Sequence, residues 1–231
     1  MCIEVLGRIH TSTRHRRLWA LTTVVLMTCV SLWLFGETHP AVGAHPVLVT
    51  VDPGHGGIDP GAIGARGELE KQWNLAVAEN LANGLRSRGV GVLLTRVNDR
   101  HLSRPYSVQQ ELLLRAALAN RSGSALLISL HLNIESTGRA IGPIVYYQAG
   151  NVRSRRLAQA LETALAAVSG ILNPPRPSHL LILMASRVPS VVVELGFLST
   201  PADRARLATP GYRAVLAKAL ANGILYYLGR S

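Results

Sequence analysis

The sequence predicts an α/β fold: a single-domain, three-layer sandwich in which helices flank a mixed, partly parallel sheet. Short runs of β-branched and other apolar residues alternate along the chain with longer segments that repeat apolar residues at helical spacing. The chain has no internal repeat, and its 231 residues suffice for one such domain behind a separate N-terminal segment. Strands that alternate with helices in this way favour a sheet that is at least partly parallel.

The strands are predicted from continuous or alternating apolar runs. Val and Thr alternate near residues 47–51 before Asp52-Pro-Gly54, which is typical of a strand that ends in a turn. Uninterrupted apolar runs before His131 and before Glu194 indicate two buried strands. In chain order the predicted strands are 47–51, 90–95, 125–130, 144–147, 180–184 and 190–194.

Helices are predicted where apolar residues recur every three or four positions. From Trp73 to Leu85 an apolar residue returns at every fourth position, and Gly89 follows as a stop signal. The segments 58–68 and 173–177, rich in glycine and proline respectively, are predicted loops. The predicted helices are 69–88, 107–120, 154–168 and 212–228.

Residues 1–44 are predicted to be a signal peptide or membrane anchor that precedes a folded domain at 45–231. Three arginines at 14, 16 and 17 precede an uncharged, mostly apolar run at 18–36. This run approaches the ~20 residues that cross a bilayer, and the arginines are expected to stay inside. Val42-Gly-Ala44 is an acceptable cleavage site. With or without cleavage, we expect the domain to be exported to the extracytoplasmic side of the membrane or to the cell wall.

The composition excludes several kinds of site. Both cysteines, Cys2 and Cys29, fall in the N-terminal segment, so the domain can form no disulfide, thiolate zinc site or cysteine nucleophile. The net charge of +11 suits attraction to anionic wall polymers as well as general solubility. The basic residues are scattered and no nucleic-acid motif is present, so we expect no nucleic-acid partner. A Gly-x-Ser-x-Gly motif is absent, which argues against a serine hydrolase.

Three predicted strands end close to a residue that can bind a metal or transfer a proton, namely His55, His131 and Glu194. The carboxyl ends of strands gather reactive groups in folds of this class. Two imidazoles, a carboxylate and water make the open tetrahedral site of a catalytic zinc. The carboxylate ligand could be Glu194, or Glu70 at the start of the first predicted helix. Each of these residues, considered alone, could instead have a purely structural role. For example, Glu70 could interact with the dipole of the helix that it begins.

Four motifs occur in a specific order from about residue 47 to residue 228. They are Val51-Asp-Pro-Gly-His-Gly-Gly57, Glu70-Lys71 with Asn74-Leu75, Ile128-Ser-Leu-His-Leu-Asn133, and Val193-Glu-Leu-Gly-Phe-Leu-Ser199. In this order the chain resembles the zinc-dependent N-acetylmuramoyl-L-alanine amidases of the amidase-3 family, with 45–231 as the catalytic domain. The resemblance also extends to Thr95-Arg96, Arg115 and Ala119-Asn120, to which we assign no firm role.

The resemblance implies a site and a reaction. His55, Glu70 and His131 would bind Zn²⁺, and Glu194 would be the catalytic base. The substrate would be peptidoglycan, hydrolysed at the amide between N-acetylmuramic acid and L-alanine. Glu68 is a rival to Glu70, although the adjoining Lys71 favours Glu70.

The chain departs from the family pattern beside two of these ligands. Gln72 stands where the family usually has Asp, and Leu132 stands where it usually has Ala. Neither change replaces a ligand, so we expect them to affect specificity more than activity.

A narrower resemblance is to the amidases that act in spore cortex maturation, before muramic δ-lactam forms. A single catalytic domain behind a hydrophobic segment fits that group, as do Arg176, Leu180-Leu181, 189–199 and Pro201-Ala-Asp203. The alternatives are a zinc peptidase that trims wall stem peptides, a vegetative amidase in cell separation, and a non-catalytic wall-binding module. No His-Glu-x-x-His motif supports the peptidase, and all four site residues are present, against the binding module. The sequence also allows for an accessory partner protein, whose identity it does not indicate.

Overall fold

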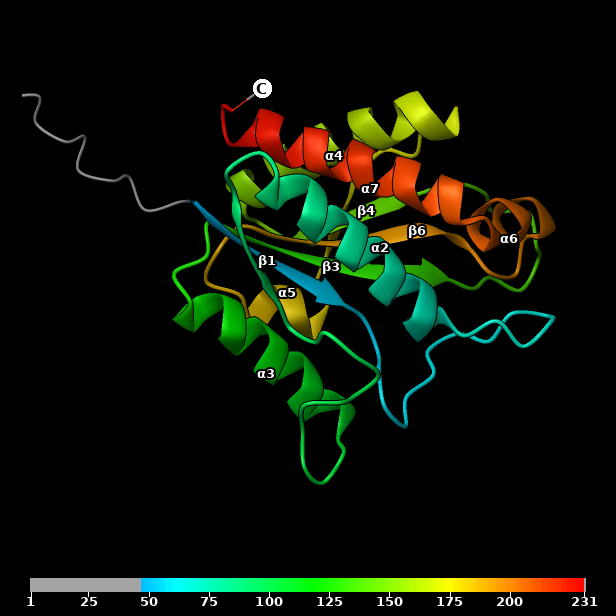
Figure 1. Cartoon of the computed structure of the whole chain (residues 1–231), viewed down its shortest axis with the longest axis horizontal. Coiled ribbons are helices and arrows are strands. Elements are labelled where there is room, and N and C mark those ends of the chain that lie inside the picture. The colour runs from blue at the N-terminus through cyan, green and yellow to red at the C-terminus, as the bar shows by residue number, and fades with distance from the viewer. Residues whose placement is uncertain (1–46, 231) are drawn as a thin grey trace, which may run out of the picture. The chain divides into compact units, whose positions relative to one another are not determined.

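A computed structural model of the chain describes residues 47–230 (Figure 1). The predicted leader at 1–44, with its apolar run, its cleavage site and both cysteines, lies outside the described residues. Within the described part of the chain, no helix is long and apolar enough to cross a membrane.

Six strands form one mixed sheet in the order β2-β1-β3-β6-β4-β5. Neighbouring strands run parallel, except for the antiparallel pair β4 and β6. The sheet is therefore mixed and mostly parallel, as the alternation of elements predicts. The strands are β1 (Leu48–Pro53), β2 (Gly91–Leu94), β3 (Leu126–Asn133), β4 (Ile144–Gln148), β5 (Arg176–Ser178) and β6 (Ser190–Phe197).

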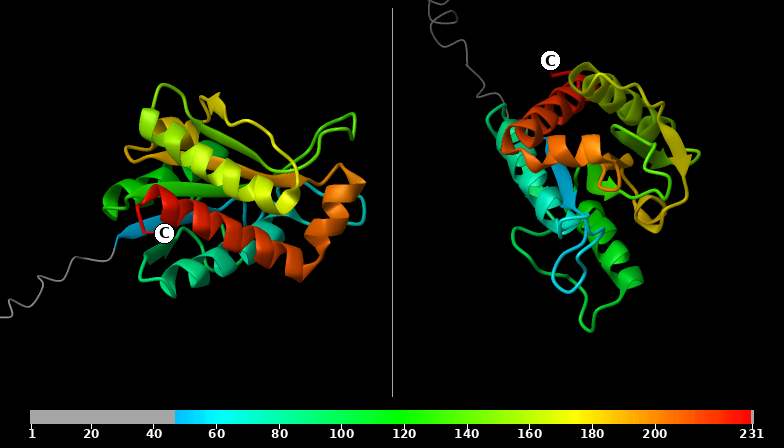
Figure 2. Two further views of the ribbon diagram at one scale, coloured as in Figure 1. Left: turned by 90° about the horizontal axis from the view of Figure 1, so that it is seen from above. Right: turned by 90° about the vertical axis from the view of Figure 1, so that its right-hand side faces the viewer.

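Helices cover both faces of this sheet, which confirms the three-layer sandwich. The larger core joins one face to α2, α4 and α7, whereas a smaller core joins the other face to α3 and α5. Figure 1 shows the two layers of helices above and below the strands, and the further views in Figure 2 show the same arrangement. The helices are α2 (Glu70–Arg86), α3 (Val108–Arg121), α4 (Val152–Ser169), α5 (Leu181–Ala185), α6 (Pro201–Ala208) and α7 (Pro210–Tyr227).

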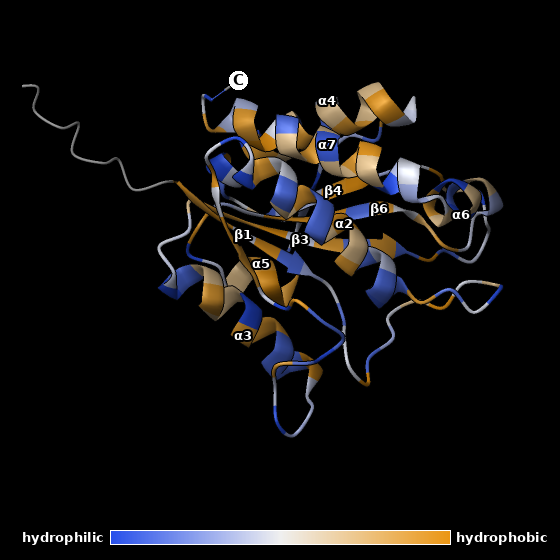
Figure 3. Cartoon of the chain, in the orientation of Figure 1, coloured by the Kyte–Doolittle hydropathy of each residue, from blue (hydrophilic) through white to orange (hydrophobic). Residues whose placement is uncertain are grey.

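The strand sequences explain why both faces are covered. In β6, Val191 and Val193 belong to the larger core and Val192 to the smaller one, because successive side chains point to opposite faces. Glu194 follows in this alternation and so shares the face of Val192. The strands are accordingly coloured mostly as hydrophobic in Figure 3, whereas α2 carries hydrophobic and hydrophilic residues on different sides.

Local signals set the helix boundaries. The side chains of Ser107 and Asn151 accept hydrogen bonds from the first turns of α3 and α4, and Gly170 ends α4 in a left-handed conformation with a φ of 73°. Proline occupies the first position of α6 and α7, where its missing N–H has no cost.

Three segments differ from the sequence prediction. The predicted strand at 180–184 is wrong, because Leu181–Ala185 is the short helix α5, which packs Ile182 and Leu183 into the smaller core. A short apolar run does not distinguish a strand from a buried helical turn. The predicted loop at 173–177 contains the start of β5, and α6 was not predicted at all.

Candidate active site

The site lies at the carboxyl ends of three adjacent strands. The chain leaves β1 through α2 to reach β2 on one side, and then passes through α3 to reach β3 on the other side. Strand order therefore reverses next to β1, and ligands of open α/β sheets bind at such a switch point. His55 follows β1, while His131 in β3 is the direct neighbour of Glu194 in β6. Glu70, the first residue of α2, completes the group. The right-hand panel of Figure 2 views the molecule from this end.

The side chains of His55, Glu70 and His131 converge on one point. Glu70 Oε1 lies 3.1 Å from His55 Nε2 and 3.1 Å from His131 Nδ1, and the two ring nitrogens are 3.2 Å apart. Tetrahedral zinc with bonds of about 2.0–2.1 Å separates its ligand atoms by roughly 3.3–3.4 Å. The spacing and the chemistry of these donors therefore fit a zinc ion.

Glu194 has the properties expected of a general base. Its Oε2 atom is buried and has no hydrogen-bond partner among the described residues. Burial raises the pKa of Glu194 to about 7, against the opposing charge interaction with His131. A carboxylate with an unused acceptor and a raised pKa, placed beside a metal site, is suited to take a proton from water.

Glu70 is held by the backbone as well as by the histidines. Its Oε1 accepts a hydrogen bond from the Leu132 N–H at 2.9 Å, and its Oε2 accepts one from Ala62 at 2.7 Å. Burial opposes the charged form, but the two histidines outweigh this effect and lower the pKa of Glu70. The contact at Leu132 uses the main chain, and Gln72 is exposed. Neither departure from the family pattern therefore alters this carboxylate.

His55 is oriented by a second carboxylate. Its Nδ1 lies 2.8 Å from Asp59 Oδ2, which also accepts a hydrogen bond from the Tyr106 hydroxyl at 2.9 Å. This contact directs Nε2 toward Glu70, in the manner by which an outer carboxylate orients a metal-binding histidine. Burial alone would lower the pKa of His55, but Glu70 and Asp59 raise it to about 9.

The backbone of His55 is held in an unusual conformation. Its φ is 61°, and among the described residues it is the one non-glycine residue with a positive φ. Arg115 donates to the His55 carbonyl oxygen at 2.8 Å and to that of Pro53 at 2.8 Å. The guanidinium is itself fixed by Asp52 at 2.7 Å and by Glu111 at 3.0 Å. A buried ionic network thus supports the turn that carries His55.

Two glycines allow His55, Glu70 and His131 to pack this closely. A Cβ atom at Gly54 would lie 2.3 Å from the His131 ring. A Cβ atom at Gly61 would lie 2.6 Å from Glu70 Oε2 and 2.7 Å from His55 Cδ2. Any larger residue at either position would displace a ligand.

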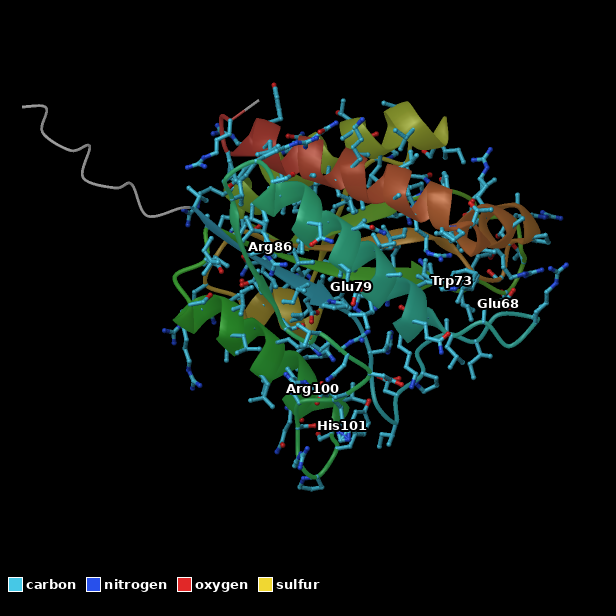
Figure 4. The ribbon with its side chains drawn as sticks, in the orientation of Figure 1. Glu68, Trp73, Glu79, Arg86, Arg100 and His101 are labelled. Carbon is cyan, nitrogen blue, oxygen red and sulfur yellow. The ribbon has the colours of Figure 1, made fainter. Side chains whose placement is uncertain are left out.

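The rival carboxylate lies elsewhere. Glu68 accepts a hydrogen bond from the Arg66 N–H at 2.8 Å, and its Oε1 lies 3.8 Å from Arg204 of α6. Figure 4 shows Glu68 in the loop that leads into α2, next to α6. The converging group of His, Cys, Asp or Glu side chains found within residues 47–230 consists of His55, Glu70 and His131 alone.

Sequence reasoning missed the supporting shell. It assigned no role to Asp52, Asp59 or Arg115. Asp59 contacts the His55 ring, Arg115 binds the backbone of the turn that carries His55, and Asp52 holds Arg115 in place. Arg96, also left without a role, is almost fully buried and donates to the carbonyl oxygens of Pro53, Gly54 and Lys71. A signal was available at Asp59, since it follows His55 by four residues in a glycine-rich loop.

Comparisons with known proteins agree with this geometry. Residues 49–226 match the model of the Amidase_3 family, described as N-acetylmuramoyl-L-alanine amidase. The chain is 31% identical over 188 residues to the germination-specific N-acetylmuramoyl-L-alanine amidase of Bacillus subtilis, covering 78% of this chain and 79% of that protein. It is 29% identical over 226 residues to the amidase AmiA of Salmonella typhimurium, covering 78% and 75% respectively.

A solved structure extends the likeness to three dimensions. The CwlD amidase from Clostridioides difficile, determined in complex with the GerS lipoprotein, superimposes with a TM-score of 0.75 at 28% identity. The match covers 80% of this chain and 100% of that one. By its sequence, the chain belongs to the amidase-3 family of N-acetylmuramoyl-L-alanine amidases.

Proposed function

We propose that this peptidoglycan amidase is zinc-dependent, uses Glu194 as its base, and acts outside the cytoplasm in spore cortex maturation. The observation that carries the zinc proposal is the convergence of three donor atoms beside an unpaired, buried carboxylate oxygen of Glu194. His55, Glu70 and His131 would hold the ion. When bound, zinc supplies Lewis-acid chemistry, since it polarises a carbonyl and lowers the pKa of water.

The residues of the chain perform the proton transfers. Glu194 takes a proton from the attacking water as the water oxygen bonds to the lactyl carbonyl carbon of N-acetylmuramic acid. The C–N bond to L-alanine then breaks, and Glu194 returns the proton to the leaving amine. The products are a free lactyl carboxylate on the glycan and a peptide that begins with L-alanine. Asp59 and Arg115 keep His55 oriented during the reaction.

The zinc proposal is tested by removing the metal. The protein is treated with a chelator, and the chelator is then removed together with the bound metal. This treatment is expected to abolish the release of peptides from peptidoglycan, and addition of stoichiometric Zn²⁺ is expected to restore it. Full activity of protein shown by elemental analysis to be metal-free would contradict zinc dependence.

The proposal of a spore role is supported by the named germination-specific relative. A free lactyl carboxylate is the group from which a muramic δ-lactam can close. Export follows from the predicted leader at 1–44, and the CwlD–GerS complex supports an accessory lipoprotein as a partner. Loss of the protein from a sporulating host should remove muramic δ-lactam from the cortex. Normal cortex with unseparated daughter cells would favour the vegetative role instead.

A further inference from the structure

A second depression opens beside the site. This groove has a volume of about 430 Å³ and lies where β3, β4, β5 and β6 meet the loops at 135–141 and 171–173. Asn133, Ile144, Tyr146 and Phe197 line it from the strands. The proposed mechanism uses none of these residues.

Strand register relates the groove to the candidate site, because Ile144 lines the groove and pairs with Glu194. His131, Glu194 and Ile144 are direct neighbours across β3, β6 and β4, so their side chains form one row on one face of the sheet. Adjacent strands are about 4.8 Å apart, which places Ile144 roughly 10 Å from His131. A chain bound across the strands would pass from the site into the groove.

The walls of the groove are fixed by polar contacts, of which those of Asp203 are buried. The Asn173 side chain donates to the carbonyl oxygens of Ile141 and Pro143, both at 3.0 Å. Asp203, which is buried, accepts hydrogen bonds from Gly142 at 2.7 Å and from Phe197 at 2.9 Å. The loops that contain Gly142 and Asn173 are therefore held in place without a ligand.

The charge of the groove points to an anionic ligand. Arg139 and Arg176 line it and are exposed, and neither guanidinium forms a hydrogen bond or ion pair with any of the described residues. The groove also contains one carboxylate, Glu135, but its oxygens accept hydrogen bonds from Thr137, Arg139 and Ala140 of its own loop. The two guanidinium groups are available to a ligand, whereas Glu135 is occupied.

We infer that this groove binds the stem peptide through its free carboxylates, with Arg139 and Arg176 as specificity-determining residues. The inference rests on the proposed function, because it takes the bond next to L-alanine as the one that is cut. Peptidoglycan stems carry free carboxylates shortly after L-alanine, and three extended residues span about 10 Å. Arginine recognises carboxylates through paired, charge-assisted hydrogen bonds.

Binding and turnover are separated by working in the zinc-loaded Glu194→Gln protein. Two disaccharide-peptides serve as probes, one with the free α-carboxylate of D-glutamate and one with that group amidated. Calorimetry should show about tenfold tighter binding of the free carboxylate. Adding Arg139→Gln and Arg176→Gln should remove this preference. The matched control adds Arg153→Gln and Arg156→Gln on α4, which remove equal charge outside the groove and should keep the preference.

The outcomes distinguish the inference from the proposed function. Equal binding of the two probes, or a preference that survives loss of both groove arginines, overturns the inference alone. An equal loss of preference in the α4 control also overturns it, because general charge would then explain the effect. Failure to bind either probe, together with no cleavage by the unsubstituted protein, overturns the proposed function itself.

Discussion

His55 combines a strained backbone with a chemical role. A left-handed conformation costs a non-glycine residue about 1–3 kcal/mol and persists where its surroundings enforce it. Here Arg115 binds the His55 carbonyl and Asp59 binds its ring. The imidazole is thereby aimed at Glu70 and His131 in advance, which would reduce the reorganisation that binding of the proposed zinc requires.

At the two histidines, we predict that substitution causes loss of metal. His55→Ala or His131→Ala removes one of three donors, and we expect the purified variant to retain almost no zinc by elemental analysis. His179→Ala is the matched control, because His179 is exposed and outside the group. Near-stoichiometric zinc in either ligand variant would refute the assignment.

At Glu194, we predict that substitution causes loss of turnover without loss of zinc. Glu194→Gln has nearly the same shape but cannot accept the proton, and removal of a general base costs about 10²–10⁴ in rate. The rate of peptide release and the zinc content should be measured on the same sample. Glu68→Gln, which changes the rival carboxylate, should stay close to the unsubstituted rate. More than a tenth of normal activity in Glu194→Gln would place the base elsewhere.

At the scale of elements, the ion pair of Asp52 and Arg115 joins the end of β1 to α3. Burial disfavours the charged form of Asp52, but Arg115, Ser129 and Thr95 outweigh this and lower its pKa. Because the folded pKa lies below the unfolded value of about 3.9, the pair stabilises the fold above that pH. This stabilisation is lost as the pH falls toward the folded pKa.

The corresponding prediction concerns stability. Arg115→Met leaves a buried carboxylate without its partner and should lower the free energy of unfolding at pH 7 by about 3–5 kcal/mol. Below pH 5, the free energy of unfolding of this variant should change less steeply with pH than that of the unsubstituted protein. Urea unfolding at several pH values measures both effects. Arg121→Met, on the exposed side of the same helix, should change neither. Equal stability of Arg115→Met at pH 7 would show that the network does not support the turn.

Some helices and strands could be predicted from the sequence alone, and others could not. The regular spacing of apolar residues in α2 and the uninterrupted apolar runs of β3 and β6 predicted these elements. The strand ends predicted that His131 and Glu194 would belong to one site, and the structure shows that they are direct neighbours. The helix α5 could not be predicted, because its short apolar run gains its structure from packing mainly against α3 and also against β4 and β6. Arg115 acts through contacts that depend on the folded turn, so its role was hidden in the sequence. Asp59 also acts through the folded turn, but its position four residues after His55 was a signal that could have been used.

At the scale of the whole molecule, we propose that the domain at 45–231 carries out the reaction and that the predicted leader at 1–44 directs its export. Deleting residues 1–44 should leave a soluble domain that cleaves peptidoglycan in vitro but fails to support spore germination in the cell. The same truncated domain behind a heterologous export signal is the control, and it should restore germination. Normal germination with the untargeted domain would show that export is unnecessary.

The most direct measurement is mass spectrometry of peptidoglycan after digestion with the zinc-loaded protein. The account predicts glycan strands with free lactyl groups, together with intact stem peptides that begin with L-alanine. The Glu194→Gln protein should yield neither product. Shortened stem peptides still attached to N-acetylmuramic acid would contradict the account and identify a peptidase.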